Sequence, residues 1–138
     1  MADSVSPEKR SWIMAQIKGK DTSPELAVRS MAHRMGFRFR LHSAGLPGKP
    51  DLVFPRLGRV VFVHGCFWHG HRCREGRRVP KSNQEYWIGK IAANKARDAR
   101  TRKRLRRSGW SILVVWECQL RTPSRVQPKL WAFLSAPV

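Results

Sequence analysis

Acidic residues are scarce in this sequence. It contains 9 Asp and Glu against 28 Lys and Arg, so its formal net charge at pH 7 is +19 over 138 residues. A chain this basic repels itself in the compact state, and such a charge is usually neutralised by a polyanion. The composition therefore indicates a function that involves an anionic partner. It favours a nucleic acid first and an anionic membrane surface second.

Long apolar runs are missing as well. No stretch reaches the roughly 18 apolar residues that a membrane-spanning helix needs. The opening residues, MADSVSPEKR, lack the apolar segment of a signal peptide. We therefore expect no membrane partner and a cytoplasmic protein, associated with the nucleoid when it is bound to DNA.

Cysteine is rare, and its count of three is odd. An odd number argues against a framework made only of disulfides. In a cytoplasmic chain with histidines close by, metal binding is the better interpretation. The sequence has no internal repeat and no Gly/Ser-rich linker, and its length suits one domain over residues 1–138.

The hydrophobic spacing predicts an α/β sandwich, which is a mixed sheet with helices on both sides. Capping residues and glycines mark the helix ends, and two apolar runs are typical of strands buried on both faces. Helices are predicted from about Ser6, over 22–35, over 83–108 and around 129–134, and strands over 37–41, 51–54, 60–64 and 110–116.

A run of cysteines and histidines follows the first buried strand. CFWHGHRC, residues 66–73, holds four candidate ligands, and Cys118 lies just past the second buried strand. These residue types favour a tetrahedral zinc site, and the set chosen is Cys66, His71, Cys73 and Cys118. The alternative is three buried free thiols with surface histidines.

Because carboxylates are few, those near strand ends are candidate catalytic residues. Asp51 is the first residue of a predicted strand, where its oxygen atoms suit a hard cation, and His64 ends the next strand. His69 is surplus to a four-ligand zinc site and is a candidate general base. Glu25, in the first turn of the second predicted helix, is a further candidate. Three of these residues have a structural alternative: turn chemistry for Asp51, a core position for His64, and a capping box with Thr22 for Glu25.

Aromatic and basic residues next to this run are candidates for DNA contact. Phe67, Trp68 and Trp87 could insert beside a weakly stacked base pair, although Trp87 could also be a core residue. Asn94 could read a base edge. Seven Lys and Arg between 97 and 107 point all round the predicted helix, so most of them form a solvated face. Arg77 and Arg78 lie in a second basic segment.

Three motifs together resemble one known family. They are FRFRL with LPGKPD in residues 37–51, VHGCFWHGHRC in residues 63–73, and VWEC in residues 115–118. The resemblance extends from MAQI at residues 14–17 to Cys118, which is nearly the whole chain. The sequence is similar to the very short patch repair (Vsr) endonucleases.

The resemblance implies a restriction-endonuclease-like core with one structural zinc. It also implies Mg²⁺-dependent hydrolysis, with two ions, that nicks one strand 5′ to the thymine of a T:G mismatch. By position, Asp51 and the main-chain carbonyl of Val63 would bind Mg²⁺, and Glu25 and His64 would support the hydrated ions. His69, held by Asp98, would activate or orient the attacking water. The zinc ligands match the set chosen above.

The same resemblance implies DNA contacts and partners. The substrate would be duplex DNA whose T:G pair arises from deamination of 5-methylcytosine, which links the chain to a cytosine-5 methyltransferase. Accessory mismatch-repair proteins are further partners, and one nick suits a monomer. A helical arm over about residues 1–22 would contact DNA. The residues assigned to DNA are Met14, Phe67, Trp68, Trp87, Asn94, Lys90, Arg77 and Arg78.

The sequence departs from the usual family pattern at three positions near the site. Val63 stands where threonine is common, Gly70 stands where histidine is common, and position 72 is Arg. Two other functions stay open on these residues alone. One is a restriction-type nuclease of the same fold that acts on other DNA, and the other is a zinc DNA-binding module without enzymatic activity.

Overall fold

The computed structural model describes residues 22–42 and 45–137, which form one mixed sheet with helices on both faces. The sheet has the order β1-β2-β3-β4. Its first two pairings are antiparallel and the third, between β3 and β4, is parallel. The strands are β1 Arg40–Leu41, β2 Leu52–Phe54, β3 Arg59–His64 and β4 Ser111–Trp116.

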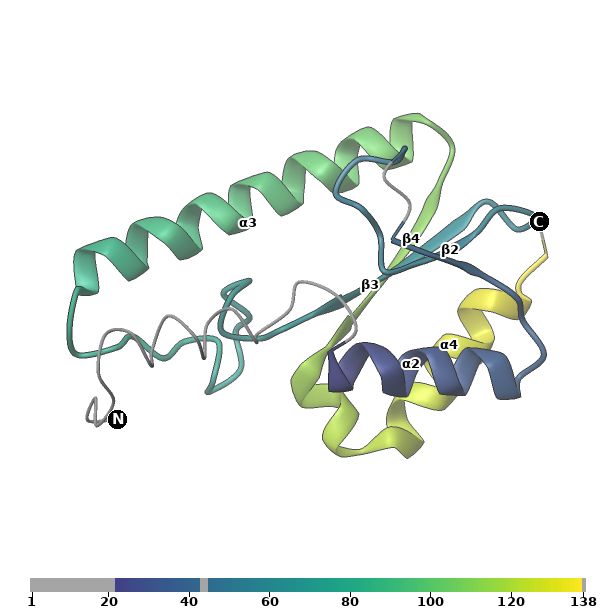
Figure 1. Cartoon of the computed structure of the whole chain (residues 1–138), viewed down its shortest axis with the longest axis horizontal. Coiled ribbons are helices and arrows are strands. Elements are labelled where there is room, and N and C mark those ends of the chain that lie inside the picture. Colours follow the sequence, from purple (N-terminus) through teal and green to yellow (C-terminus); the bar gives the residue numbers. More distant parts are fainter. Residues whose placement is uncertain (1–21, 43–44, 138) are drawn as a thin grey trace.

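Four helical segments surround this sheet. They are α2 Ser23–Arg34, α3 Gln84–Arg107, the 3-10 helix η1 Glu117–Arg121 and α4 Pro123–Ser135. The long helix α3 lies on one face and provides the crossover between the parallel strands β3 and β4, while α2 and α4 lie on the other face (Figure 1). This arrangement confirms the predicted α/β sandwich.

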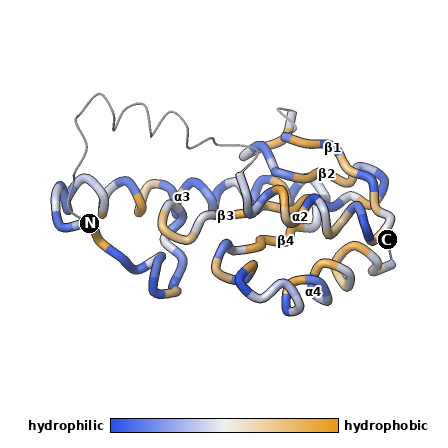
Figure 2. Tube along the Cα trace, turned by 60° about the horizontal axis from the view of Figure 1, so that its bottom comes forward, coloured by the Kyte–Doolittle hydropathy of each residue, from blue (hydrophilic) through white to orange (hydrophobic). Residues whose placement is uncertain are grey.

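Two apolar clusters hold the layers together. The larger joins α2 and α4 to the sheet through buried residues that include Val28, Val61 and Leu130. The smaller lies under α3, where Leu105 packs against Val60 and other apolar residues. Alternate residues of β3 thus point to opposite layers, and the hydrophobic colour of Figure 2 follows the strands and α4 more than α3. Central β3 is buried on both faces, as predicted.

Three expectations about the elements need correction. The strand predicted over 37–41 is reduced to the two residues of β1. Strand β4, predicted to be buried on both faces, is an edge strand and is mostly half-buried, because it has a neighbour on one side only. The last helix begins at Pro123 and continues through Pro128. Its buried residues recur every fourth position, at 126, 130 and 134, so packing outweighs the hydrogen bond that Pro128 cannot donate.

The helix predicted from Ser6 lies outside the described residues. Within residues 22–42 and 45–137, no helix combines the length and the apolar content that crossing a bilayer requires.

Candidate active site and metal centre

A cavity of about 820 Å³ lies where β3 ends, between the sheet, the loop before β2 and α3. Because β2 and β3 are antiparallel, the start of β2 lies beside the end of β3. The two are joined by a hydrogen bond of 2.6 Å, which the backbone N–H of Val63 donates to Asp51 Oδ2. The lining includes five residues predicted from the sequence: Asp51, Val63, His64, His69 and Asp98.

Glycine permits the close approach that closes this cavity. Gly48 has φ of 73°, and a Cβ at this position would lie 2.3 Å from the Thr101 Cγ2 atom of α3. No side chain fits there unless Thr101, the loop or the helix moves. Both residues line the cavity, so this contact brings the loop that ends at Asp51 up against α3.

The Asp51 carboxyl group is poorly solvated and lies near a second acid. Burial is the main cause that raises the pKa of Asp51 to about 7, and the nearby Glu25 adds to the rise. The hydrogen bond from Val63 opposes it. A buried carboxylate next to another carboxylate is unfavourable unless a positive charge compensates it. Arg29, which pairs with Glu25, supplies part of this charge, and a bound cation would supply more.

His69 and Asp98 form a pair at the other wall of the cavity. Nδ1 of His69 lies 2.6 Å from Oδ2 of Asp98. Burial alone would raise the pKa of Asp98, but the hydrogen bond and the charge of His69 outweigh it and hold this pKa below its ordinary value. An ionised carboxylate can only accept, so Nδ1 carries the proton and Nε2 of a neutral His69 has a free lone pair.

His64 lies flat against His69. The ring centroids are 3.8 Å apart and the planes differ by 2°. Burial, and then the neighbouring His69, lower the pKa of His64 to about 3, so the ring is neutral at physiological pH. Among the described residues, its buried Nδ1 atom has no hydrogen-bond partner. Such an atom needs water or a metal-bound ligand in the cavity.

Glu25 reaches the same region from the first turn of α2. The predicted cap is present, because the Thr22 hydroxyl accepts a hydrogen bond of 3.4 Å from the Glu25 backbone N–H. The Glu25 side chain, however, is 2% exposed and lies against Arg29, and its Oε2 is 2.9 Å from His42 Nε2. The ligand atoms of Glu25, His42 and Asp51 all lie within 4.8 Å of one another.

His42 is the residue that the sequence analysis missed. It follows β1 directly, and its backbone N–H lies 3.4 Å from the carbonyl of Asp51, which it faces across the β1–β2 pairing. A histidine at the end of a strand beside a functional carboxylate is a usable signal. It becomes visible only when the register of a two-residue strand is known.

The four predicted zinc ligands converge in a second cluster. Cys66, His71, Cys73 and Cys118 each offer a ligand atom within 4.8 Å of the others. The Cys118 Sγ and His71 Nδ1 atoms are 3.6 Å apart. Tetrahedral bonds of about 2.3 Å to sulfur and about 2.1 Å to nitrogen would place two such atoms roughly 3.6 Å apart. The side chains therefore fit a zinc ion.

The thiols of this cluster differ in their surroundings. Burial raises the pKa of Cys66 to about 12. The pKa of Cys73 falls to about 6, because hydrogen bonds from His71 and from the Gly76 backbone outweigh its desolvation. A zinc ligand must be a thiolate, and the ion's own charge promotes its formation at Cys66. The alternative of unrelated free thiols does not fit this convergence.

The aromatic residues predicted to contact DNA form a cluster with one another. The ring centroids of Phe67, Trp68 and Trp87 are 5.4–5.6 Å apart in all three pairs. The Arg78 guanidinium lies 5.0 Å above the Phe67 ring. Phe67 and Trp87 also line a small cavity of about 230 Å³ with Ile88. All three aromatic rings are half-buried, so the cluster is neither a closed core nor a free surface.

Asn94 of α3 binds the loop that contains Phe67 and Trp68. Its side chain is buried and donates a hydrogen bond of 2.8 Å to the Trp68 carbonyl, and it accepts one from Arg97. Lys90 and Arg77 are exposed. Met14 lies outside the described residues, so the structure places it nowhere.

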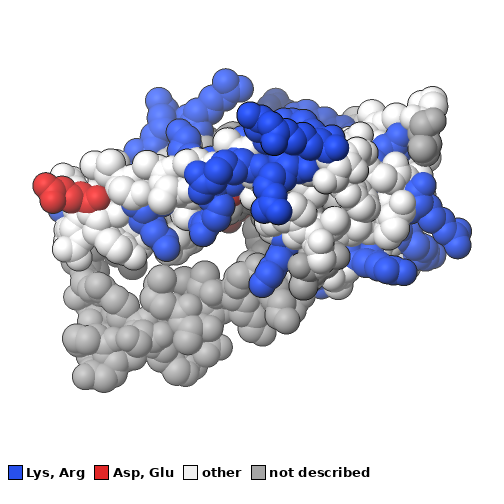
Figure 3. Space-filling view, turned by 90° about the horizontal axis from the view of Figure 1, so that it is seen from above, with Lys and Arg blue, Asp and Glu red and all other residues white. Residues whose placement is uncertain are grey.

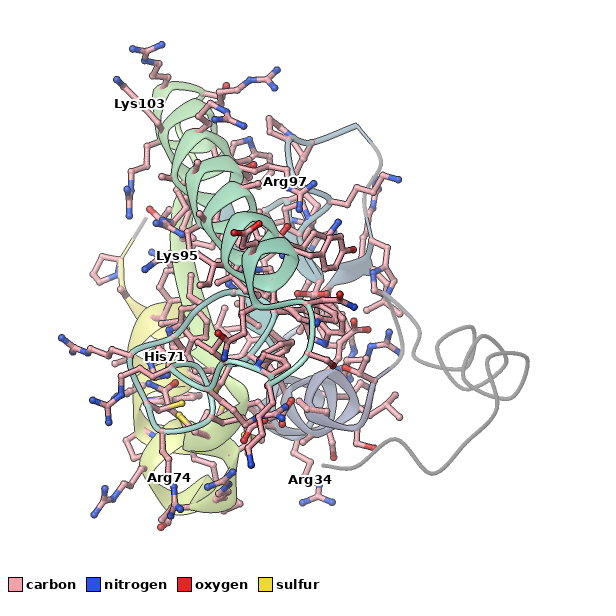
Figure 4. The ribbon with its side chains drawn as sticks, turned by 90° about the vertical axis from the view of Figure 1, so that its left-hand side faces the viewer. Arg34, His71, Arg74, Lys95, Arg97 and Lys103 are labelled. Carbon is pink, nitrogen blue, oxygen red and sulfur yellow. The ribbon has the colours of Figure 1, made fainter. Side chains whose placement is uncertain are left out.

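Basic side chains gather on the face formed by α3 (Figure 3). Figure 4 looks along this helix: Lys103 projects away from the body of the molecule, whereas His71 lies in the loop that precedes α3 and Arg74 projects from that loop. Arg97 and Arg102 line the large cavity, together with Lys49. The candidate active site therefore opens within a positively charged surface that suits a phosphate backbone.

Comparisons with known proteins identify the family of this chain. Residues 2–75 match the family model described as DNA mismatch endonuclease Vsr. The DNA mismatch endonuclease Vsr of Escherichia coli is 43% identical over 121 residues, which are 88% of this chain and 77% of that protein. The type II nicking enzyme V.XorIIP of Xanthomonas oryzae is 52% identical over 130 residues, 94% of this chain and 95% of that protein.

A solved structure agrees on the fold. The catalytic domain of the homing endonuclease I-Bth0305I superposes with a TM-score of 0.55 at 16% identity, over 84% of this chain and 100% of that domain. This similarity confirms the restriction-endonuclease-like core that the sequence predicted. A binding module without enzymatic activity is not supported by any of these relatives. The chain belongs to the DNA mismatch endonuclease Vsr family and is a DNA endonuclease.

Proposed function

We propose that this endonuclease nicks one strand of duplex DNA 5′ to the thymine of a T:G mismatch, in a reaction that requires Mg²⁺. The mismatch would arise from deamination of 5-methylcytosine. One observation carries the proposal: the cavity that holds Asp51 and the His69–Asp98 pair lies next to the Phe67–Trp68–Trp87 cluster, in one continuous loop and helix. Hydrolysis and recognition of a deformed base pair would thus take place side by side.

Asp51 and the main-chain carbonyl of Val63 would bind the catalytic cation, with Glu25 and His64 supporting its water ligands. The half-buried Asp51 beside the buried Glu25, and the His64 Nδ1 atom that has no partner among the described residues, support this assignment. Two Mg²⁺ ions bound there would supply charge neutralisation at the phosphate and at the leaving oxygen. A separate zinc ion on Cys66, His71, Cys73 and Cys118 would fix the loop between β3 and α3.

His69 would take up the proton of the attacking water. Asp98 accepts a hydrogen bond from the Nδ1–H group and so leaves the Nε2 lone pair of a neutral His69 for this role. The same hydrogen bond fixes the ring orientation. His64, neutral and stacked on His69, keeps the ring from rotating out of the cavity.

Recognition would combine insertion of aromatic rings with phosphate contacts. A T:G pair is easily deformed, which lowers the cost of wedging Phe67, Trp68 and Trp87 beside it. Lys90, Arg77 and Arg78 would contact the flanking DNA, and Asn94 would read a base edge. We further propose that residues 1–138 act as one domain, in which an arm over about residues 1–22, with Met14, reaches the DNA from another side.

The remaining proposals concern the cellular setting. A cytosine-5 methyltransferase would create the sites at which T:G pairs arise, and the flanking sequence would match its target. The protein would act as a monomer in the cytoplasm, associated with the nucleoid when it is bound to DNA, together with accessory mismatch-repair proteins.

One assay tests the proposed reaction. Duplexes labelled on either strand and carrying T:G, T:A or C:G at one position are incubated with the protein, with and without Mg²⁺. We expect a nick in the thymine strand of the T:G duplex, in the presence of Mg²⁺ only. Cleavage of both strands of the matched duplexes would instead indicate a restriction-type nuclease.

An Asp51→Ala variant provides the control. It should retain binding to the T:G duplex and lose cleavage, because it removes a cation ligand without removing the basic surface. Unchanged cleavage by this variant would contradict the assignment of Asp51.

A further inference from the structure

His42 lies in the candidate active site and has no role in the proposal above. Its Nε2 atom, a carboxylate oxygen of Glu25 and one of Asp51 lie within 4.8 Å of one another. The three residues come from the loop after β1, from α2 and from the start of β2, and His42 and Asp51 line the same cavity. The question is what a histidine contributes beside two carboxylates.

Arg29 indicates how the His42 ring is oriented. Its Nη2 atom contacts Glu25 Oε2 and lies 3.0 Å from His42 Nε2. A guanidinium group can only donate hydrogen bonds, so Nε2 accepts from Arg29 in the tautomer that leaves this nitrogen unprotonated, and in the other tautomer it donates to Glu25 Oε2, 2.9 Å away. In the unprotonated tautomer, Nε2 and Glu25 Oε2 are two acceptors that share the positive group of Arg29. Arg29 stands where a cation shared by the two would bind.

The spacing suits a metal ion. In an octahedral site with bonds of about 2.1 Å, neighbouring ligand atoms are roughly 3.0 Å apart. The distance of 2.9 Å between His42 Nε2 and Glu25 Oε2 matches such an edge. A hydrogen-bonded pair shows a similar distance, so the distance permits metal binding without requiring it. The independent argument is the guanidinium group of Arg29, a positive group that already contacts both atoms.

We propose that His42 is a direct nitrogen ligand of a divalent cation that binds between Glu25 and Asp51 and displaces Arg29. The site therefore accepts first-row transition ions such as Mn²⁺ in addition to Mg²⁺, because an imidazole is a common ligand of the former whereas Mg²⁺ binds mainly oxygen. This inference rests on the proposed function, since it adds His42 to the proposed Mg²⁺ site and makes Glu25 a direct ligand there instead of a partner of bound water.

Pulsed electron paramagnetic resonance on bound Mn²⁺ tests the nitrogen ligand directly. The full chain is loaded with zinc, freed of DNA and titrated with Mn²⁺. We expect a coupling from an imidazole nitrogen in the wild-type protein, and its isotope should change when the protein is made with ¹⁵N-histidine. The coupling should disappear in His42→Gln and in His42→Asn.

The control is His33→Gln, which makes the same change at an exposed histidine near the end of α2. It should retain the coupling. Calorimetry gives a second readout: in His42→Gln the ratio of the Mn²⁺ to the Mg²⁺ affinity should fall roughly tenfold, the scale at which even outer partners of a ligand act. A glutamine oxygen can still bind Mg²⁺, so the Mg²⁺ affinity should change less.

Three results would overturn the assignment. They are a nitrogen coupling that persists in both His42 variants, Mn²⁺ bound in the wild type without any nitrogen coupling, and an unchanged affinity ratio. In each case, Mg²⁺-dependent nicking of the T:G duplex that is lost in Asp51→Ala would leave the proposed function standing. Absence of any divalent-cation binding outside the zinc cluster would overturn both.

Discussion

Asp51 shows at the scale of one residue how function opposes stability. Its pKa of about 7 in the folded protein compares with 3.8 for an unperturbed carboxyl group, with burial as the main cause. The folded state therefore holds this proton more tightly than the unfolded state does. Without a bound cation, the stability of the protein should fall as the pH rises from about 4 to about 7.

An Asp51→Asn variant should remove this loss. In Mg²⁺-free buffer with the zinc retained, we expect it to exceed the wild type in free energy of unfolding at pH 8 by about 1–3 kcal/mol, discounted for partial solvation. Near pH 4 the two should be nearly equal, because the wild-type carboxyl group is then protonated. Urea denaturation at both pH values measures the difference. A variant that is less stable than the wild type at pH 8 would show that the carboxylate is already compensated.

The role of a residue could be predicted where a local sequence motif indicates it. It could not be predicted where it depends on how two strands pair. Asp51, His64 and His69 could be chosen because each sits at the end of an apolar run or next to a ligand cluster. His42 could not, because its neighbour Asp51 is reached through a two-residue strand that the alternation in residues 37–41 overstates. Pairing of strands is a tertiary property that local pattern leaves open.

At the scale of elements, the loop between β3 and α3 is attached to the helix at two points one turn apart. Asp98 binds His69, and Asn94 donates to the Trp68 carbonyl. Gly70, which replaces the more common histidine, has φ of 59°, and a Cβ there would lie 2.7 Å from an Ile91 methyl group. The chain gains a close loop–helix contact at this position, so α3 positions the aromatic cluster and the catalytic histidine together.

An Asn94→Asp variant should loosen this attachment. Aspartate keeps the size of the side chain but cannot donate to a carbonyl. We expect faster amide hydrogen exchange in residues 65–71 and slower nicking of a T:G duplex, with the zinc content unchanged. Ala96→Asp, which adds the same charge at an exposed position of α3, is the matched control. Equal exchange rates in the two variants would show that the Asn94 hydrogen bond does not hold the loop.

The last helix depends on a contact that no local pattern indicates. Arg59 at the start of β3 is buried, and its guanidinium donates to the carbonyls of Leu134, Ala136 and Pro137. These acceptors lie at the carboxyl end of α4 and just beyond it, where carbonyls lack partners within the helix. Arg59 lies one residue before the strand predicted over 60–64, and no local pattern there indicates a partner 75 residues away.

Replacement of this arginine should destabilise the protein without touching its chemistry. We expect Arg59→Met to lower the free energy of unfolding by about 2 kcal/mol, the usual contribution of hydrogen bonds to a charged group. Arg56→Met, at an exposed position of the turn that precedes β3, should change it by less than about 0.5 kcal/mol. Thermal denaturation compares the two, and similar melting temperatures would mean that water satisfies the carbonyls of α4 equally well.

At the scale of the whole molecule, the larger apolar cluster and the basic surface lie on opposite sides of the sheet. The α2 and α4 layer carries the larger apolar cluster, and the α3 layer carries the cavity and much of the basic surface. Composition alone could predict that a polyanion binds. It could not predict which of the many Lys and Arg side chains face the substrate, because the basic residues of α3 point in all directions around the helix.

Arg102 and Lys103 separate the contributions of this surface. Arg102 is half-buried and lines the cavity, whereas its neighbour Lys103 is exposed and projects away from the body of the molecule (Figure 4). Each phosphate that a side chain neutralises releases counterions and adds roughly 0.9 to the slope of the logarithm of affinity against the logarithm of salt concentration. Measured in an Asp51→Ala background, which prevents cleavage, Arg102→Gln should weaken DNA binding and reduce this slope by about 1. Lys103→Gln should leave the slope nearly unchanged, so equal slopes for the two variants would show that DNA does not enter the cavity between β3 and α3.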